Sequence, residues 1–348
     1  MIKEGKHEVN VLMTFQANPV FDNPEPEVTA AVLKDEKLVP HLFAVDSFIT
    51  ETAALADIVL PAATYLESWG VQSVPSYQLV PSVSVRQPVV PPQGESVPVH
   101  DILIELARRT GGGMEKYFSF SNMESYISAA VAHIEGLAKE GGVAYLKTHG
   151  VWTDASAPIA YQSYRQEGFK TPSGKYEVHS KTLESAGFAA LPTYEPIEAT
   201  RELRGDEFVL ITFQSSVHNG TNAPVSMWLS EIDHENPLWI NAEVAKAAGI
   251  KRGDKVRVVS QAGEVTAKAQ PSHGIHPKTV AICRRSGHWE YGKVARGERF
   301  ESKDPNTRLI WWDGHGNSVH AYRLIPVSPD PIGGSQAWMD TRVTISKA

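Results

Sequence analysis

Short apolar runs alternate with helix-forming segments at the start of the chain. The run from Val9 to Phe15 is stopped by an Asn-Pro pair and predicts a buried strand that enters a loop. A helix is predicted from Glu25 to Lys34, a second strand over "HLFAVDS", a second helix over "TETAALADIVL" and a short strand over "DIVLP". This order of elements predicts a parallel, Rossmann-like sheet. No Gly-x-Gly-x-x-Gly turn is present in it, so NAD and FAD are not assigned.

The middle of the chain has a more mixed pattern. Residues 71–95 are rich in proline and β-branched side chains and predict an extended connection. The stretch "SVPVHDILIELARRTGGG" predicts an amphipathic helix, with Ile102, Leu103 and Leu106 at helical spacing and a glycine stop. Residues 114–140 are expected to be helical again, and residues 141–205 to be mixed. A helical and mixed region therefore follows the first sheet.

The last third consists of short runs in which β-branched residues alternate with polar ones. The runs are "EFVLITFQ", "LWIN", "KVRVVSQ", "EVTAKAQ", "TVAICRRS" and "DTRVTISK", and turn residues separate them. Short strands at such close intervals predict a closed barrel or a sandwich.

Composition narrows the possible functions. The 348 residues carry a net charge of -7 and no Lys/Arg cluster interleaved with aromatics, so nucleic acid is not expected as a partner. The one cysteine, Cys283, lies in an apolar strand pattern and is predicted to be a buried core thiol. A single thiol cannot hold an iron–sulfur cluster, so any cluster is expected on another chain or on a missing half. No transmembrane segment and no secretory signal is expected.

A polar corner follows the second predicted strand. It consists of Asp46, Ser47, Thr50, Glu51 and Thr52. Open α/β sheets bind ligands at the carboxyl ends of their strands, which favours a ligand-binding role for these side chains. The alternative is a helix N-cap, with Ser47 or Thr50 as the cap and Glu51 near the positive end of the helix. The local sequence alone leaves both interpretations open.

Six segments, in this order, resemble the carboxyl-terminal half of molybdopterin-dinucleotide oxidoreductases, the dimethyl sulfoxide reductase family. They are "ANPVFDNP", "VDSFITETAALADIVLPAATYLESWG", "TPSGKYEVHS", "HNGTNAPVSMWLSEIDHENPLWIN", "AKAAGIKRGDKVRVVSQAGEV" and "GNSVHAYRLIPVSPDPIGGSQAW", and they extend over nearly the whole chain. The "HNGTN…ENPLWIN" and "DPIGG" segments look most like the polysulfide, thiosulfate and arsenate reductase branch.

The resemblance implies an α/β fold in which a Rossmann-like parallel-sheet portion is followed by a double-psi β-barrel. The implied domains are a Rossmann-like cofactor-binding portion at 1–95, a helical and mixed connecting region at 96–204, and a molybdopterin-dinucleotide-binding barrel at 205–348. The implied cofactor is molybdopterin guanine dinucleotide with molybdenum or tungsten, whose metal ligand is not in this chain.

The resemblance also places candidate cofactor-binding residues on four segments. In the first sheet, Asp46 or Glu51 would read guanine or ribose, and Ser47, Thr50 and Thr52 lie in the same corner. The remaining candidates are Asn18 after the first strand, then Ser215, His218, Asn219, Thr221 and Asn222 beyond one barrel strand, Arg284, Arg285, Ser286 and His288 beyond another, and Asn317 and His320 in the last loop.

The sequence departs from the family because the usual amino-terminal half is absent. The leading hypothesis is the cofactor-binding part of an oxidoreductase that acts on a small oxyanion or sulfur compound. The expected partners are the amino-terminal half or a catalytic partner chain, an Fe–S electron-transfer subunit, and also a membrane anchor subunit. The implied setting is anaerobic respiration in the periplasm, with the cytoplasm as the alternative. Two other hypotheses stay open: a metal-free scaffold subunit of a membrane-associated quinone or electron-transfer complex, and a truncated fragment.

Overall fold

The first sheet is built on a parallel pair of strands. β1 (Val11–Phe15) pairs with β2 (His41–Asp46) in a register that sets Val11 opposite His41 and Phe15 opposite Val45. β3 (Ile58–Pro61) flanks β2 on its other side, so the order is β1-β2-β3. The last three residues of the central strand β2 are buried. This agrees with the sheet predicted from the sequence.

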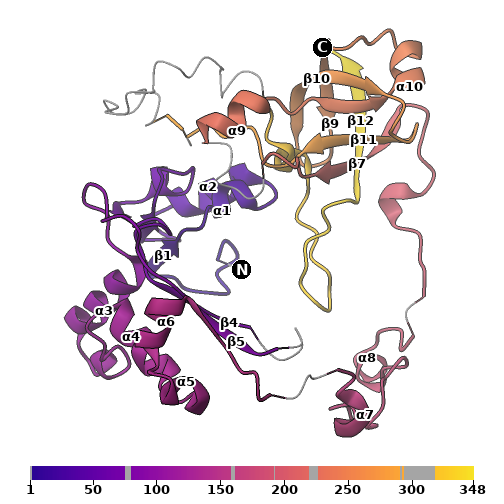
Figure 1. Ribbon diagram of the computed structural model, residues 1–348. Coiled ribbons are helices and arrows are strands. Elements are labelled where there is room, and N and C mark those ends of the chain that lie inside the picture. The colour runs from indigo at the N-terminus through magenta and orange to yellow at the C-terminus, as the bar shows by residue number, and fades with distance from the viewer. Residues whose placement is uncertain are drawn as a thin grey trace. The chain divides into compact units, whose positions relative to one another are not determined.

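The computed structural model describes residues 2–74, 80–157, 161–191, 193–218, 226–290, 292–293 and 318–348 (Figure 1). These form two compact units. One unit combines Met1–Leu60 with Pro196–Ala348, and the other is Pro61–Glu195. The predicted domain boundaries at residues 95 and 204, which separate cofactor-binding parts from a connecting region, remain a prediction.

Two helices connect β1 to β2. α1 (Pro19–Asp22) is a single turn, and α2 (Pro26–Lys34) matches the predicted helix. Both helices begin with proline, whose missing N–H leaves no donor unpaired at a helix start. Val20 and Leu33 of these helices pack with Leu42 of β2 in one small apolar core. The turn that leaves β1 is thereby fixed against the sheet.

The helix predicted over residues 50–60 is wrong in length, since only a 3₁₀ turn, η1 (Ala53–Leu55), forms there. By Asp57 the chain is already paired with β2, because the backbone of Asp57 donates to the Leu42 carbonyl and its carboxylate accepts the Leu42 N–H, both at 2.8 Å. The rest of the segment between β2 and β3 is not helical. Its polar side chains are used in tertiary contacts instead.

The barrel contains all six strands predicted from the last third of the sequence. They are β7 (Glu207–Phe213), β8 (Leu238–Asn241), β9 (Lys255–Val259), β10 (Glu264–Ser272), β11 (Thr279–Cys283) and β12 (Thr341–Lys347). The closed order is β10-β8-β11-β7-β12-β9. β10 with β8 and β11 with β7 are parallel, and the other pairs are antiparallel. The predicted fold class, a parallel sheet followed by a double-psi barrel, is confirmed.

Buried apolar side chains of the strands fill the interior of the barrel. The fully buried interior side chains include Leu210, Leu238, Ile240, Val256, Val258, Val280 and Ile282. α10 (Ala242–Ala247) and the 3₁₀ turn η7 (Ala321–Leu324) contribute further apolar side chains to the same core. Cys283, at the end of β11, is buried as predicted. The barrel is thus a packed core, and its polar chemistry lies in the loops that leave the strands.

The second unit packs helices on a small antiparallel sheet. Its strands are β4 (Gly70–Val74), β5 (Ser82–Arg86) and β6 (Val151–Thr153), and its helices are α3 (Val99–Thr110), α4 (Met123–Val131), α5 (Glu135–Lys139), α6 (Val143–His149), α7 (Tyr164–Glu167) and α8 (Lys181–Ser185). Residues 71–95 therefore include a strand pair within the predicted extended connection. Ile127, Leu137 and Leu146 are fully buried in this unit.

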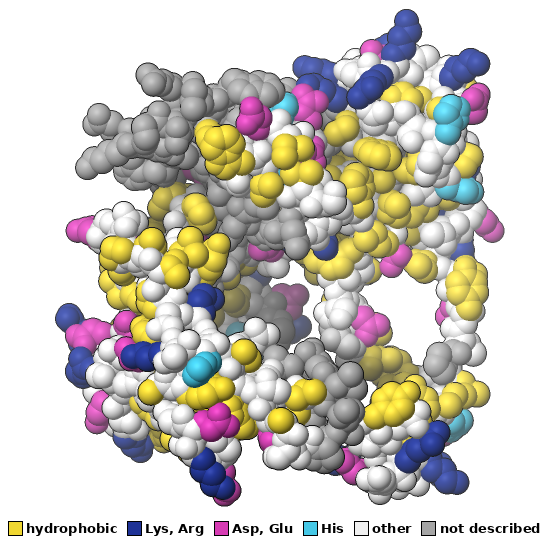
Figure 2. All heavy atoms as spheres, in the orientation of Figure 1, with side chains coloured by type: hydrophobic (Ala, Val, Ile, Leu, Met, Phe, Trp, Pro, Cys, Tyr) yellow, Lys and Arg dark blue, Asp and Glu magenta, His cyan; other side chains and the backbone are white. Residues whose placement is uncertain are grey.

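On the face in Figure 2, acidic and basic side chains are interspersed among apolar ones.

Candidate functional site

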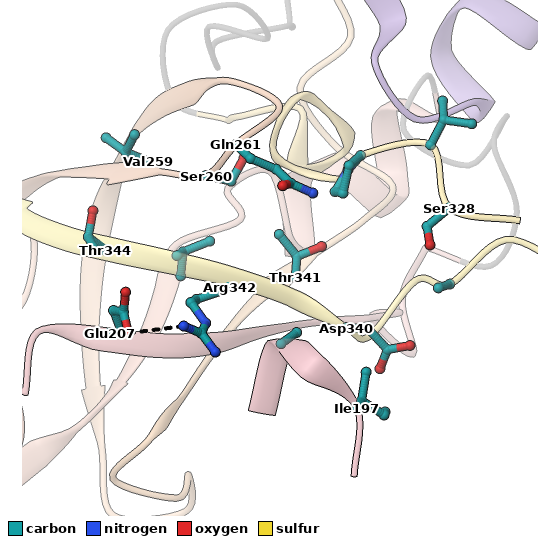
Figure 3. Close-up of a pocket in the computed structure, with 15 residues that line it drawn as sticks. Ile197, Glu207, Val259, Ser260, Gln261, Ser328, Asp340, Thr341, Arg342 and Thr344 are labelled. Carbon is teal, nitrogen blue, oxygen red and sulfur yellow. Dashed lines mark hydrogen bonds and ion pairs between the residues drawn. The ribbon is translucent and has the colours of Figure 1, made fainter. Parts of the chain in front are cut away.

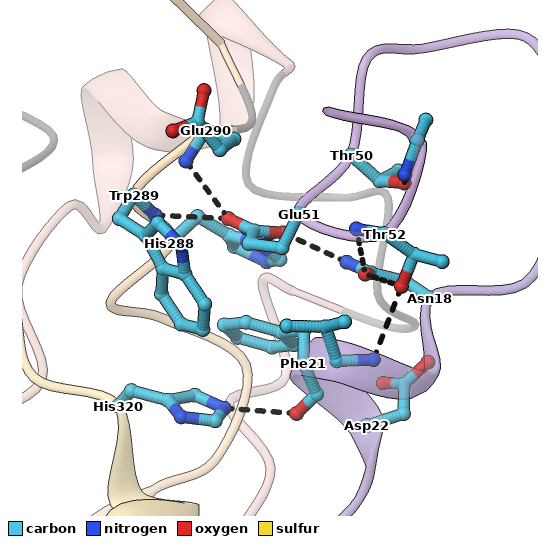
Figure 4. Close-up of polar contacts among 12 residues, drawn as sticks. Asn18, Phe21, Asp22, Thr50, Glu51, Thr52, His288, Trp289, Glu290 and His320 are labelled. Carbon is cyan, nitrogen blue, oxygen red and sulfur yellow. Dashed lines mark hydrogen bonds and ion pairs between the residues drawn. The ribbon is translucent and has the colours of Figure 1, made fainter. Parts of the chain in front are cut away.

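Asn18, the residue that precedes α1, is the centre of a buried hydrogen-bond group (Figure 4). Its amide oxygen accepts from the backbone N–H and the hydroxyl of Thr52, at 3.1 and 2.8 Å. Its amide nitrogen donates to Glu51 Oε2 at 2.8 Å. The Thr52 hydroxyl also accepts the N–H of Val20 at 3.1 Å. The ends of β1 and β2 are therefore linked by side chains that the sequence predicted as candidates.

Glu51 is 1% exposed and takes its remaining partners from the loop after β11. Oε1 accepts the backbone N–H groups of Trp289 and Glu290 at 2.8 and 3.1 Å, and Oε2 accepts Nδ1 of His288 at 3.0 Å. Burial raises the pKa of Glu51, but the hydrogen bond and charge of His288, with the Asn18 amide and the Glu290 N–H, outweigh burial and hold the pKa well below its usual range. Glu51 is therefore a buried anion.

Asp46 differs from Glu51 although both are buried carboxylates of the same corner. Burial raises the pKa of Asp46, and backbone N–H groups of Ser47 and Phe48 oppose that shift. Its Oδ1 accepts from Phe48 N at 3.3 Å, a local turn contact. The contacts described for Asp46 are thus local, and the carboxylate keeps acceptor capacity for a ligand. The Thr50 hydroxyl accepts the Ala53 N–H at 3.1 Å, but the N-cap position of η1 is Thr52, whose side chain does not cap the turn.

His288 and His320 lie on either side of the Phe21 ring. The rings of Phe21 and His288 stack at 3.6 Å with an interplanar angle of 10°, and those of Phe21 and His320 are 4.1 Å apart. Burial lowers the pKa of His320 to about 3, so its ring is neutral at pH 7. Its Nε2 donates to the Phe21 carbonyl at 2.9 Å, because a carbonyl can only accept. Nδ1 is then an acceptor, and it has no partner among the described residues.

A cavity of about 190 Å³ adjoins these rings. Its lining comes from the loops after β11 and before η7, together with the start of β10: Glu264, Val265, Gly287, His288, Trp289, Ser318, Val319, His320 and Arg323. Gly287 has a φ of +88°, and a Cβ there would lie 2.3 Å from the carbonyl carbon of Val319 and from the backbone nitrogen of His320. Only glycine allows the two loops to approach this closely.

The remaining described candidates surround this centre. Arg285 forms an ion pair with Asp22 of α1 at 3.4 Å, and Arg284 donates to Gln214 at 3.3 Å. Ser286 is half-buried. Ser215 donates to the carboxylate of Asp233 at 2.7 Å, just after α9 (Met227–Ile232).

His218 is also buried, and it contacts the carbonyl of Asp233. Four predicted residues, Asn219, Thr221, Asn222 and Asn317, lie outside the described residues. The structure therefore groups Asn18, Glu51, Thr52, His288 and His320 most closely. Cofactor contact by any of the candidates remains a prediction.

Sequence reasoning missed two buried residues that lie beside this group. Asn236 is 2% exposed, and its amide donates to the carbonyls of Cys283 and Val319 at 2.9 and 2.7 Å while its oxygen accepts the Val319 N–H at 2.8 Å. Phe21 is fully buried between the histidines. The Asn-Pro pair before β8 was an available signal for Asn236, since a polar residue at the start of a buried strand needs partners. Phe21 gave no signal beyond its apolar character.

A larger pocket, of about 660 Å³, lies on the wall of the barrel near β12 and the end of β9 (Figure 3). Glu207 and Arg342 face each other there at 3.4 Å, and a hydrogen bond from Arg204 lowers the pKa of Glu207 to about 2. None of the predicted site residues lines this pocket. Because the Glu207 carboxylate is held by arginines of the same chain, the pocket is a weaker candidate than the polar group around Glu51.

Two protein-family models match the chain. Residues 1–109 match "Molybdopterin oxidoreductase", and residues 208–336 match "Molydopterin dinucleotide binding domain". The chain belongs to the molybdopterin oxidoreductases. The predicted cofactor, molybdopterin guanine dinucleotide with molybdenum or tungsten, agrees with both matches. The polar group around Glu51 draws on residues from both matched segments, because Asn18 and Glu51 lie in the first and His288 lies in the second.

The curated relatives that match the chain include proteins named for reactions of sulfur compounds and oxyanions. It is 29% identical to the molybdopterin-containing subunit of the thiosulfate reductase of Salmonella typhimurium, over 94% of this chain and 42% of that protein. It is 25% identical to a sulfite dehydrogenase chain of Allochromatium vinosum, over 98% and 43%, and 26% identical to the molybdopterin-containing subunit of the arsenate respiratory reductase of a Shewanella species, over 84% and 40%. The chain thus spans less than half of the length of these relatives.

A solved structure supports the fold. Acetylene hydratase from Pelobacter acetylenicus superposes with a TM-score of 0.74 at 19% identity, over 97% of this chain and 44% of that chain. Within the described residues, no helix is long and apolar enough to cross a membrane, and no group of three or more His, Cys, Asp or Glu residues is arranged to hold a metal ion.

Proposed function

We propose that this chain forms the molybdopterin-guanine-dinucleotide-binding part of an oxidoreductase that acts on a small oxyanion or sulfur compound. One observation carries the proposal. Residues from both matched segments converge on one buried polar group beside a cavity, through the contacts of Glu51 with Asn18 and with the loop that contains His288. When bound, the metal and its dithiolene ligands supply the redox chemistry, and the protein binds and orients the cofactor.

The residues fit the chemistry of such a cofactor. Pterin and guanine rings carry N–H donors, and His320 Nδ1 is a buried acceptor without a described partner. Asp46 is a buried carboxylate whose described contacts are local, which suits the N–H groups of a guanine. Arg284 and Arg285 offer guanidinium groups of the kind that bind phosphate oxygens. The donor and acceptor types needed for the pterin, the base and the phosphates are therefore all present.

The substrate class rests on the relatives. Thiosulfate, sulfite and arsenate are small anions, and they appear in the names of three relatives that match most of this chain. Because these relatives are named as subunits, we also propose that the chain works with a catalytic half or partner chain and with an Fe–S electron-transfer subunit. A periplasmic location and a membrane anchor subunit complete this proposal, and they rest on the resemblance alone.

The proposal is tested on the complex purified with its native partners. Reduced viologen is offered with thiosulfate, arsenate, selenate or trimethylamine N-oxide, and an oxidised dye is offered with sulfite. We expect turnover with at least one of the sulfur compounds or oxyanions. A complex that contains stoichiometric metal and cofactor but turns over only with trimethylamine N-oxide, or with none, would refute the substrate class.

A further inference from the structure

The carboxylate of Glu51 is saturated by donors of its own chain. A carboxylate has about four lone-pair sites on its two oxygens. Among the described residues, four donors occupy them: Trp289 N and Glu290 N on Oε1, and Asn18 Nδ2 and His288 Nδ1 on Oε2. The residue is 1% exposed. A cofactor atom could reach Glu51 only by displacing one of these buried donors, which would then lack a partner.

The four donors come from two distant parts of the chain. Asn18 follows the first strand of the sheet, whereas His288, Trp289 and Glu290 belong to the loop after β11. The same junction carries the Arg285–Asp22 ion pair, which is more exposed than Glu51. Because buried charge-assisted hydrogen bonds are the stronger kind, the contacts of Glu51 hold this loop against the sheet more firmly than the Arg285–Asp22 ion pair does.

We infer that Glu51 is a positioning residue that clamps the His288–Glu290 loop to the end of β1, and that it does not itself read the cofactor. This inference rests on the proposed function, and it reassigns Glu51 from the guanine-reading role that the sequence suggested. The clamp acts on the cavity wall, because His288 and Trp289 both line the cavity of about 190 Å³. By holding His288 Nδ1, Glu51 also fixes the orientation in which that ring stacks on Phe21.

A matched control exists in the other compact unit. Glu67 is 5% exposed, and its two oxygens accept the backbone N–H groups of Thr64 and Gln93 at 2.6 and 2.7 Å. Glu67 therefore resembles Glu51 in burial and in its use of backbone donors, but its described partners do not belong to the loop after β11. Replacing either glutamate by glutamine changes charge and hydrogen bonding with almost no change in volume.

The first test measures amide hydrogen exchange in the purified complex, over peptides that cover residues 284–290. In Glu51→Gln we expect the Trp289 and Glu290 amides to exchange at least about tenfold faster. The reason is that the local opening of the loop, which exposes these amides to solvent, costs less free energy. Glu67→Gln should accelerate only the Thr64 and Gln93 amides. Unchanged exchange at Trp289 and Glu290 in Glu51→Gln would overturn the inference.

The second test separates positioning from cofactor reading. Glu51→Gln should retain the guanine and metal content of the wild type, while the reduction potential of the metal rises because a buried negative charge is lost. Glu67→Gln should leave the potential unchanged. A loss of guanine from Glu51→Gln together with normal exchange at residues 288–290 would show that Glu51 reads the cofactor. If the glutamine variant does not fold, Asn18→Ser removes one of the four donors and should accelerate the same two amides to a smaller extent.

A failure of the proposed function can be distinguished from a failure of the inference about Glu51. A wild-type complex without metal and without guanine would refute the proposed function. The exchange comparison between Glu51→Gln and Glu67→Gln would still decide whether the clamp exists, because it is measured on protein amides.

Discussion

The Nε2 proton of His320 binds the carbonyl oxygen of Phe21 at 2.9 Å, which joins the loop before η7 to α1. Burial keeps this histidine neutral by lowering its pKa to about 3. In the unfolded chain the same side chain would protonate near its ordinary pKa of 6.5. Between these two pH values, the unfolded state therefore binds a proton at His320 that the folded state does not bind.

This difference predicts that His320 makes the protein less stable as the pH falls from 6.5 toward 3. The expected slope is at most about 1.4 kcal/mol per pH unit, which is the value for one proton. In His320→Gln that part of the pH dependence should disappear. Unfolding midpoints measured at several pH values for the wild type and the variant would test this, and parallel curves would contradict it.

Gly287→Ala should be strongly destabilising. The added Cβ would lie 2.3 Å from backbone atoms of Val319 and His320, and the φ of +88° is itself unfavourable for alanine. Gly253→Ala is the control, because Gly253 has a φ of +85° with nothing within 4 Å of the added Cβ. We expect the control to cost about 1 kcal/mol of unfolding free energy and Gly287→Ala to cost clearly more. Equal costs would show that the two loops do not meet closely.

Asp46→Asn should weaken retention of the guanine nucleotide. A charge-assisted hydrogen bond is worth about 1.5–3 kcal/mol, so we expect about a tenfold to hundredfold weaker binding. Asp35→Asn is the control, because Asp35 Oδ1 accepts the N–H two residues on, as Asp46 Oδ1 does, but it is exposed. The guanine nucleotide content of both variants after extended dialysis measures this retention. Identical retention would remove Asp46 from the binding residues.

Asn236→Asp should disturb the loops after β11 and before η7 together. The substitution replaces an amide that donates to two carbonyls, of Cys283 and Val319, with a carboxylate oxygen that can only accept. We expect a loss of more than about 2 kcal/mol of unfolding free energy. Asn241→Asp should cost less, because its oxygen would still cap α10 through the Glu243 and Val244 N–H groups. Equal losses in the two variants would contradict the role of Asn236.

The sequence predicted the barrel better than the connections. β7 and β9 alternate between more and less buried residues, and that period of two is visible without any tertiary information. α3 shows the limit of such patterns. Its predicted apolar positions included Leu106, which is 41% exposed, whereas Ile104 and Ala107 are buried. A helix with apolar residues around much of its surface does not reveal which face its neighbours cover.

The candidate site was predictable in its residue types but not in its pairings. The strand ends and the polar residues after them were visible in the sequence. The partners of Glu51 were not, because His288 is 237 residues away and two of the four donors are backbone N–H groups, which every sequence contains. Local sequence therefore suggested a ligand contact or a helix cap for Glu51. The fold shows a third use, a contact between two distant parts of the chain.

The central claim is that this chain binds molybdopterin guanine dinucleotide with its metal. The most direct measurement is the molybdenum, tungsten and acid-released guanine content of one sample of the complex, purified with its native partners. We expect molybdenum or tungsten together with guanine nucleotide in a fixed ratio to the chain. A folded native complex that contains neither metal nor guanine would contradict the claim and favour a metal-free scaffold.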